Sequence, residues 1–184
     1  ATNSAMRSIR SNGAMIKKVY VPKYIYPFSG ILANFIIFLI SLIVLVGVMV
    51  FFVANGSYHA PMNGYMVLSV VPLVNLFILA MGVGMILATL CVFFRDIEYL
   101  WSVMLMMIMY CSAIFYFVDN MSKSTQLIVK ANPLFGIINN FRRALCGQPF
   151  DMTLLTYTSV ISVAALLIGM FVFYKKQDAF ILNI

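Results

Sequence analysis

FSGILANFIIFLISLIVLVGVMVFFV, residues 28–53, is the stretch that decides the fold. It lies inside a longer run, from Tyr24 to Phe94, that contains no Asp, Glu, Lys or Arg. A membrane-spanning helix needs only about 20 apolar residues, so this run is long enough for two. The polar segment 55–64, rich in Asn, Gly and Pro, divides it into one span at 28–53 and a second at 65–94.

Two more uncharged runs follow, at 99–118 and 152–174, and each is long enough to cross a hydrocarbon core of about 30 Å as a helix. The chain is 64% hydrophobic and 9% charged, which leaves no room for a soluble catalytic domain. Outer-membrane barrel strands alternate over only about 10 residues, so a barrel is excluded. We predict an all-α integral membrane protein with four transmembrane helices.

The basic residues gather beside the membrane segments, and the formal net charge is +7. Five precede the first span, and Lys175 and Lys176 follow the last. The positive-inside rule therefore places both ends in the cytoplasm. The external segment 119–151 also carries four basic residues, so the rule is not obeyed throughout. Because the charges flank membrane spans, the expected partners are membrane lipids and not nucleic acid.

Residues 1–23 form a basic amphipathic segment, in which Met6, Ile9, Ile16 and Tyr20 recur at helical spacing. Gly13 interrupts the pattern, so two short helices are as consistent as one. The periodicity favours a helix lying on anionic lipid. The alternative is a docking surface for a cytoplasmic partner.

Small and polar residues inside the first two spans predict helix packing. Asn34 and Ser41 share a helical face that should look inward. The second span carries a seam of small residues at four-residue spacing, which lets another helix approach closely. These residues are Ala80, Gly84 and Ala88.

A short cytoplasmic link at 93–101 joins the second and third spans, so that 24–118 holds three transmembrane helices. Its charged residues are Arg95, Asp96 and Glu98, and Arg95 and Glu98 stand three apart, where they can pair on a helix. The third span is rich in Met and ends in aromatic residues, which usually pack but in a transporter can line a path for a sugar. The possible channel aromatics are Tyr110, Phe115, Tyr116 and Phe117.

Residues 119–151 predict an external helical hairpin. Asn132 is a favourable N-cap and Pro133 suits the first helical position, so a helix should begin there. A shorter helix should precede it, at about 122–131. A fifth span would bury four basic residues at a cost of about 10 kcal/mol in total. A hairpin dipping into the outer interface avoids that cost. The expected apolar stripe is Leu134, Ile137, Ile138, Phe141 and Leu145, opposed by Asn139, Asn140, Arg142 and Arg143.

Enzymatic chemistry is disfavoured. The lone histidine, His59, is in a predicted external loop, and no HExxH or GxSxG motif occurs. The three cysteines stand apart, and no metal site or cofactor is expected. No span holds two acids that might couple an ion. The remaining classes are a passive pore, a packing subunit, or a permease driven by an ATPase on a separate chain.

Three ordered motifs resemble the ABC-2 type permeases that export polysaccharides, a family that includes O-antigen, capsule and teichoic acid exporters. They are SNGAMIKKVYVP at 11–22, VFFRDIEYLW at 92–101 and NPLFGIINNFRRAL at 132–145. The resemblance covers essentially the whole chain. It implies six spans, of which this chain supplies the last four, the final one and the cytoplasmic tail being 152–184.

The resemblance also implies roles for particular segments. The N-terminal segment becomes a coupling segment that contacts a separate ABC ATPase subunit, through Ile9, Arg10, Ile16, Lys17 and Lys18. The hairpin becomes an outer gate, whose residues are Asn132, Pro133, Phe141, Arg142 and Arg143. Two permease copies would surround a channel for a lipid-linked glycan in a bacterial plasma membrane. The alternatives are an ABC-2 permease for a lipid or a drug, and a non-transport membrane scaffold.

Overall fold

A computed structural model of the chain describes residues 1–18, 22–55, 68–94, 96–112, 114, 122–177 and 180, without the side chains of 16–18 and 125. All regular structure within these ranges is helical, which confirms the predicted all-α fold for the described part of the chain. The helices are α1 (Thr2–Ser11), α2 (Gly13–Lys18), α3 (Ile25–Ala54), α4 (Val70–Phe93), α5 (Ile97–Cys111), α6 (Lys123–Ala131), α7 (Pro133–Leu145) and α8 (Met152–Lys176).

Three of the described helices, α3, α4 and α8, are long and apolar enough to cross a membrane. The expected third span is described only in part: α5 has 15 residues and a length of about 22 Å, less than the hydrocarbon core of a bilayer. The helix ends at Cys111, and the hydroxyl of its C-cap residue, Ser112, donates to the Ile108 carbonyl at 2.6 Å. A hydroxyl that competes for backbone groups weakens a helix locally. Residues 115–118, which were expected to complete the span, lie outside the described residues.

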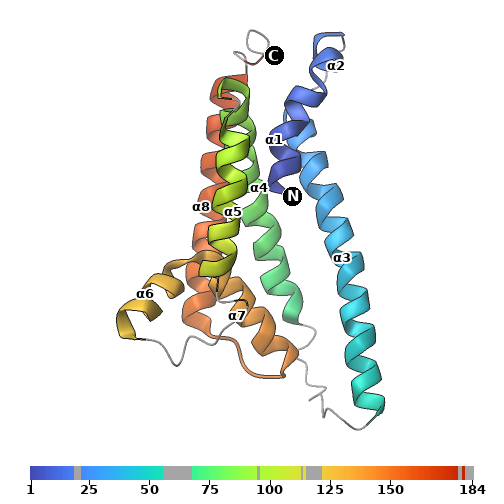
Figure 1. Ribbon diagram of the computed structural model, residues 1–184, viewed down its shortest axis with the longest axis vertical. Coiled ribbons are helices and arrows are strands. Elements are labelled where there is room, and N and C mark those ends of the chain that lie inside the picture. Colours follow the sequence, from blue (N-terminus) through green and yellow to red (C-terminus); the bar gives the residue numbers. More distant parts are fainter. Residues whose placement is uncertain are drawn as a thin grey trace.

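The helix α4 forms the centre of the bundle (Figure 1), with its most extensive described contacts to α8 and further contacts to α1 and α3. The buried residues of α3 all belong to its first third: Tyr26, Pro27 and Ile31. Beyond them α3 diverges from α4 (Figure 1) and exposes apolar side chains. Such a surface suits contact with lipid or with another protein chain.

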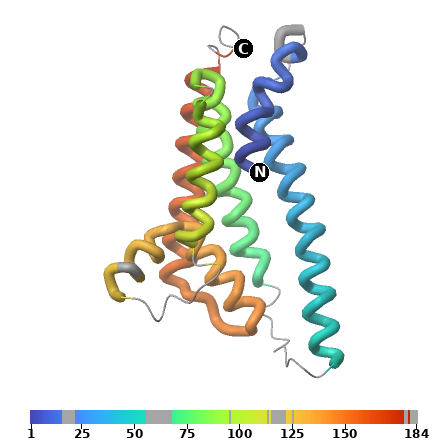
Figure 2. The backbone as a smooth tube through the Cα atoms, viewed as in Figure 1, coloured from blue at the N-terminus to red at the C-terminus, as the bar shows by residue number. Residues whose placement is uncertain are grey.

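The start of α3 and the ends of α4 and α8 lie together at one end of the bundle (Figure 2). We call it the basic end, because Lys23, Lys175 and Lys176 flank these helices there. The helices α6 and α7 lie at the opposite end, which we call the hairpin end. The segments predicted to be cytoplasmic and those predicted to be external thus lie at opposite ends of the bundle.

Glycines permit the close crossing of α4 and α8. A Cβ atom on Gly82 would fall inside van der Waals contact of the α8 backbone at Ala165 and Leu166. One on Gly169 would do the same against the Gly82 backbone. The predicted seam serves another neighbour, since a Cβ on Gly84 would lie 2.6 Å from the Ile31 side chain of α3. Small residues thus let α4 pack on two sides.

The helix α1 packs inside the bundle, which corrects the expectation that its apolar stripe lies on lipid. Ala5, Met6 and Ile9 are fully buried, and α1 contacts both α3 and α4. Of the two alternatives left open at Gly13, the structure has two helices, because α1 ends at Ser11 and α2 begins at Gly13. The reason for the error is that periodicity identifies an apolar face but not the material that covers it.

Polar pairs join the helices inside this apolar bundle. Asn34 was predicted to face the inside of the bundle, and it donates to the Ser4 hydroxyl of α1 at 2.9 Å. Ser41 on the same predicted face is exposed, and its described hydrogen bond stays within α3, to the Ile37 carbonyl, so that part of the prediction is wrong. Asn75 of α4 donates to the Ser159 hydroxyl of α8 at 2.8 Å.

Candidate functional site

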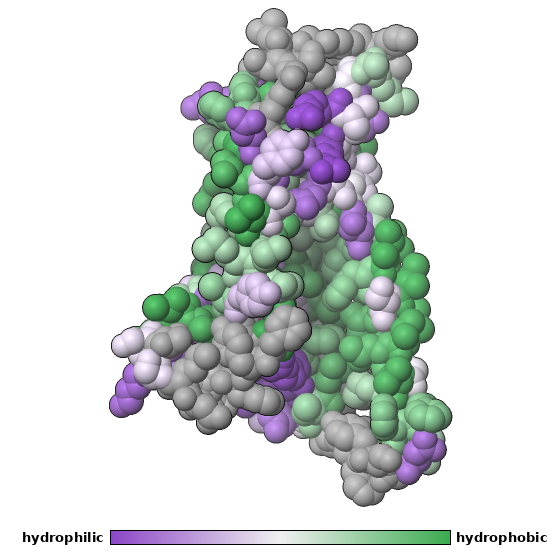
Figure 3. Space-filling model, viewed as in Figure 1, coloured by the Kyte–Doolittle hydropathy of each residue, from purple (hydrophilic) through white to green (hydrophobic). Residues whose placement is uncertain are grey.

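The seam between α1 and the start of α5 is held by two polar contacts near the basic end. Arg7 forms an ion pair with Glu98, and Trp101 Nε1 donates to the Thr2 hydroxyl at 3.0 Å. Hydrophilic residues gather at this seam, whereas α3 presents a largely hydrophobic surface (Figure 3). The predicted partner of Glu98, Arg95, lies outside the described residues, and the described partner is Arg7.

A polar cavity of about 400 Å³ opens beside this ion pair. Its lining residues are Arg7, Arg10, Ser11 and Glu98. The Arg10 side chain is exposed, whereas Glu98 is only 17% exposed and therefore belongs to the seam itself. The cavity presents the charged face of α1 on the surface of the bundle.

The structure separates the predicted coupling residues. Ile9 is fully buried in a core cluster with Ile31 of α3 and Met85 and Ala88 of α4, so its side chain fixes α1 to the bundle. Arg10 is exposed and lines the polar cavity beside Arg7 and Glu98. Ile16, Lys17 and Lys18 belong to α2, but their side chains lie outside the described part of the chain.

The helix α5 has no buried residue, and most of its Met and aromatic side chains are exposed. Tyr110 is 60% exposed, and Phe115, Tyr116 and Phe117 lie outside the described residues. Asp96 is exposed at the N-cap position, where its side chain makes no capping hydrogen bond. The helix is thus held at its start by the α1 seam and open along its length to lipid or another chain.

At the hairpin end, α7 forms hydrogen bonds with residues that follow α5. Asn132 accepts from the Leu134 backbone N–H at 3.0 Å, and Pro133 is the first residue of α7, which confirms the predicted helix start. The Asn132 amide also donates to the Ser112 hydroxyl at 3.1 Å. Arg142 donates to the Ile114 carbonyl at 3.2 Å. These contacts join the start and the end of α7 to the segment after α5.

The buried face of α7 differs from the prediction. Asn140, expected on the polar face, is fully buried, whereas Phe141 and the rest of the predicted stripe outside Ile137 are only half-buried. The Asn140 amide donates to the Gly136 carbonyl at 3.1 Å, and its oxygen accepts from the Asp151 N–H at 2.9 Å. A signal was present, because Gly136, Asn140 and Ala144 repeat at four-residue spacing and face α8, where a Cβ on Gly136 would meet the Thr158 methyl group.

The two arginines of α7 have different surroundings. Arg143 Nη1 lies 4.0 Å from the Asp151 carboxylate, which also caps α8 by accepting from the Leu154 N–H at 3.3 Å. Arg143 therefore supports the turn between α7 and α8, where Gly147 adopts a left-handed φ of 66°. Arg142 is exposed and remains on the outer surface.

These observations define a multi-pass helical membrane protein with a polar cavity near one end and an amphipathic hairpin at the other. Within the described ranges, no cluster of His, Cys, Asp and Glu that could hold a metal ion is found. The class of protein defined by these helices is a multi-pass membrane protein.

Residues 1–146 match the family model described as ABC-2 type transporter, and the chain belongs to that family. It is similar to two proteins of Klebsiella pneumoniae, each named O-antigen export system permease protein RfbA. The identities are 24% over 180 residues and 27% over 182 residues. In both cases the match covers 98% of this chain and 67% of the relative, so the chain spans about two thirds of their length.

Proposed function

We propose that the chain is the permease subunit of an ATP-driven exporter that moves a lipid-linked polysaccharide across the bacterial plasma membrane. The observation that carries the proposal is the similarity to O-antigen export permeases over 98% of the chain. The apolar helices support it, because a permease needs a path across the membrane. The amphipathic helix of the hairpin also supports it, because such a helix suits the interface at which the path opens. The glycan type, whether O-antigen, capsule or teichoic acid, is part of the proposal.

The proposed topology has four spans with both ends in the cytoplasm. α3, α4 and α8 supply three spans, and α5 together with the segment that follows it supplies the fourth. The helices α6 and α7 form an external hairpin that enters the interface without crossing. Both helices lie at the end of the bundle opposite the basic end, which supports this arrangement (Figure 1).

The proposed motor is a separate ABC ATPase subunit that docks on the exposed face of α1 and on α2. Of the predicted coupling residues, Arg10 has a described, exposed side chain for this contact, and Ile16, Lys17 and Lys18 of α2 are proposed beside it. Ile9 acts indirectly, by fixing α1 against α3 and α4. A movement of α1 would reach α5 through the Arg7–Glu98 pair.

The proposed outer gate consists of the α6–α7 hairpin in each of two permease copies. Asn132 and Pro133 set the start of the gate helix, and Arg142 remains at the exposed surface, where a guanidinium can bind a phosphate or an anionic sugar. Phe141 and Arg143 are proposed to shape the gate. The aromatic side chains of Tyr110, Phe115, Tyr116 and Phe117 are proposed to line the glycan path.

The test is deletion of the gene in its host, followed by separate analysis of surface glycan and of lipid-linked glycan inside the cell. The proposal expects loss of surface glycan and accumulation of the lipid-linked form on the cytoplasmic side. Complementation with the intact gene should restore both. Normal surface glycan after deletion, with no accumulation inside, would contradict the proposed function.

A further inference from the structure

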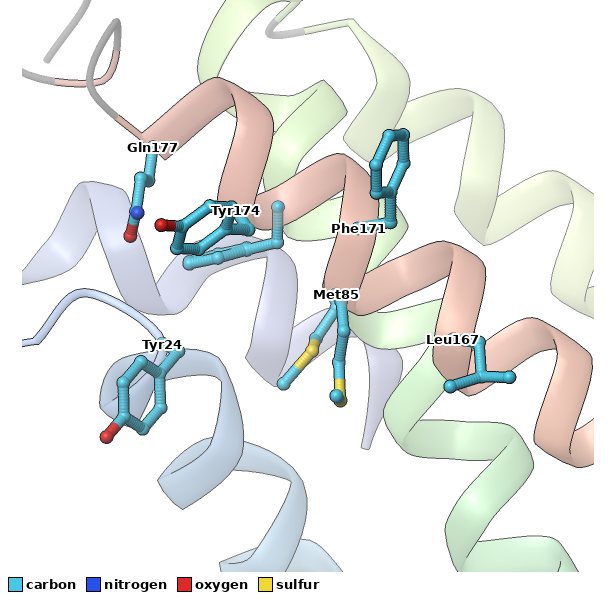
Figure 4. Close-up of a pocket in the computed structure, with 8 residues that line it drawn as sticks. Tyr24, Met85, Leu167, Phe171, Tyr174 and Gln177 are labelled. Carbon is cyan, nitrogen blue, oxygen red and sulfur yellow. The ribbon is translucent and has the colours of Figure 1, made fainter.

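An apolar groove of about 550 Å³ runs along α8 near the basic end, and it shares Met85 with the core cluster that holds Ile9 of α1. Figure 4 shows Tyr24, at the start of α3, across from Tyr174 and Gln177 at the end of α8. The remaining walls are aliphatic, sulfur-containing or aromatic. These side chains are Met85, Leu167, Met170, Phe171 and Phe173.

The groove changes character along its length. Further from the basic end its α8 wall is Leu167 and Phe171, which are 60% and 67% exposed and carry no polar atom. At the basic end, the Tyr24 and Tyr174 hydroxyls and the Gln177 amide form a polar mouth. This order, apolar within and amphipathic aromatic at the edge, matches the polarity profile from the acyl region to the headgroup region of a bilayer.

Lys23 lies at this mouth and joins its two walls. Its ammonium donates to the Gln177 carbonyl at 2.6 Å, which links the chain before α3 to the end of α8. An ammonium has three N–H donors, so two remain after this bond. Lys175 adds positive charge in the last turn of α8, whereas the Lys176 ammonium lies over the Phe93 ring, 5.9 Å from its centroid, and not in the groove lining. The mouth therefore suits one phosphate group.

We infer that this groove is a binding site for one anionic glycerophospholipid of the leaflet at the basic end. One acyl chain lies along Leu167 and Phe171, where the flexible side chains of Met85 and Met170 adapt to its shape. The headgroup phosphate accepts from Lys23 and lies between Tyr24 and Tyr174. Basic pockets between transmembrane helices at the cytoplasmic surface commonly hold anionic lipid headgroups, and the charge at this mouth favours such a lipid over a neutral one.

The test uses the whole chain in liposomes with a single tryptophan in the groove. Phe171→Trp is introduced together with Trp101→Phe, and circular dichroism verifies that the helices are retained. Bromine atoms on a lipid chain quench tryptophan at contact. Quenching by brominated phosphatidylglycerol is compared with quenching by brominated phosphatidylcholine at the same mole fraction. The site predicts severalfold stronger quenching by the anionic lipid.

Two lysine variants separate a specific site from general surface charge. Lys23→Gln should reduce the preference about fivefold, the effect of about 1 kcal/mol for one basic residue at an anionic surface. Lys176→Gln is the matched control, because it removes the same charge at the same end while its ammonium lies over the Phe93 ring, at 5.9 Å from the centroid, and not in the groove lining. This control should retain most of the preference.

Three results would overturn the inference. Equal quenching by the two lipids would show an ordinary lipid-facing surface. Equal loss of preference in the two lysine variants would show general electrostatic attraction. Absence of quenching by both lipids would show that protein covers the groove, either a second copy or another segment. None of these results depends on export, so the proposed function is tested separately.

Discussion

The crossing of α4 and α8 predicts that Gly82→Ala destabilises the protein even though alanine is the better helix former. An added Cβ at Gly82 would fall inside van der Waals contact of the α8 backbone at Ala165 and Leu166. An ordinary contact needs 3.4–4 Å, and backbone atoms cannot turn aside as a flexible side chain can. The two helices must therefore separate along the most extensive helix contact in the described structure.

The expected magnitude follows from overpacking, which costs about 1–3 kcal/mol in a close-packed interior. Gly47→Ala in α3 is the matched control, because nothing lies within 4 Å of its added Cβ. There alanine should be neutral or stabilising by up to about 1 kcal/mol, since it restricts the unfolded chain. The two variants should therefore differ by about 1–4 kcal/mol in the free energy of unfolding.

The assay is reversible unfolding in mixed micelles by titration with sodium dodecyl sulfate, followed by circular dichroism and by the fluorescence of Trp101. Gly82→Ala should unfold at a lower detergent fraction than the parent, and Gly47→Ala at an equal or higher one. Equal midpoints for the two variants would refute the close backbone crossing of α4 and α8.

Four further outcomes are expected. Arg7→Glu and Glu98→Arg should each reduce export while lowering stability by about 1 kcal/mol or less, because Arg7 is largely exposed. The double exchange should restore export, and failure of that rescue would mean that the ion pair has no part in coupling. Asn140→Leu should cost about 1–3 kcal/mol by leaving the Asp151 N–H unpaired, whereas Asn139→Leu on the half-buried side should be nearly neutral; similar costs would argue against the Asn140 contact. Arg142→Gln should impair export at normal expression, and Arg143→Gln should lower thermal stability by weakening the α7–α8 turn; normal export by Arg142→Gln would make it an interfacial anchor only. Exposed Cys146 at the hairpin end, in a Cys91→Ser and Cys111→Ser background, should react with a membrane-impermeant maleimide in intact spheroplasts; labelling only after permeabilisation would reverse the topology.

The sequence was sufficient for features that depend on local chemistry. The absence of charge from Tyr24 to Phe94 identified α3 and α4, and the Asn132–Pro133 pair located the start of α7. The Asn132–Pro133 signal depends on residues that are neighbours in the sequence. The uncharged run depends only on the transfer of apolar side chains into lipid. The family motifs likewise carried the assignment that the comparisons support.

The sequence shows which face of a helix is apolar, but it does not show whether lipid or protein covers that face, because the two environments are equally apolar. Ile9 was expected at a surface, but it is buried among α3 and α4. Asn140 was expected on the polar face of α7, but it is buried and accepts from the Asp151 N–H just before α8. Long-range pairing was missed for a related reason. Glu98 has a local candidate in Arg95, but its described partner, Arg7, belongs to a helix far away in the sequence.

The measurement that tests the central proposal most directly is transport in proteoliposomes that contain the protein and the ABC ATPase proposed as its motor. The vesicles carry lipid-linked glycan in the leaflet facing the ATPase, and a glycosidase in the opposite compartment reports arrival. The proposal predicts ATP-dependent cleavage that is lost when the ATPase cannot hydrolyse ATP. A complex that assembles and hydrolyses ATP, yet leaves the glycan uncleaved at the background rate, would contradict it.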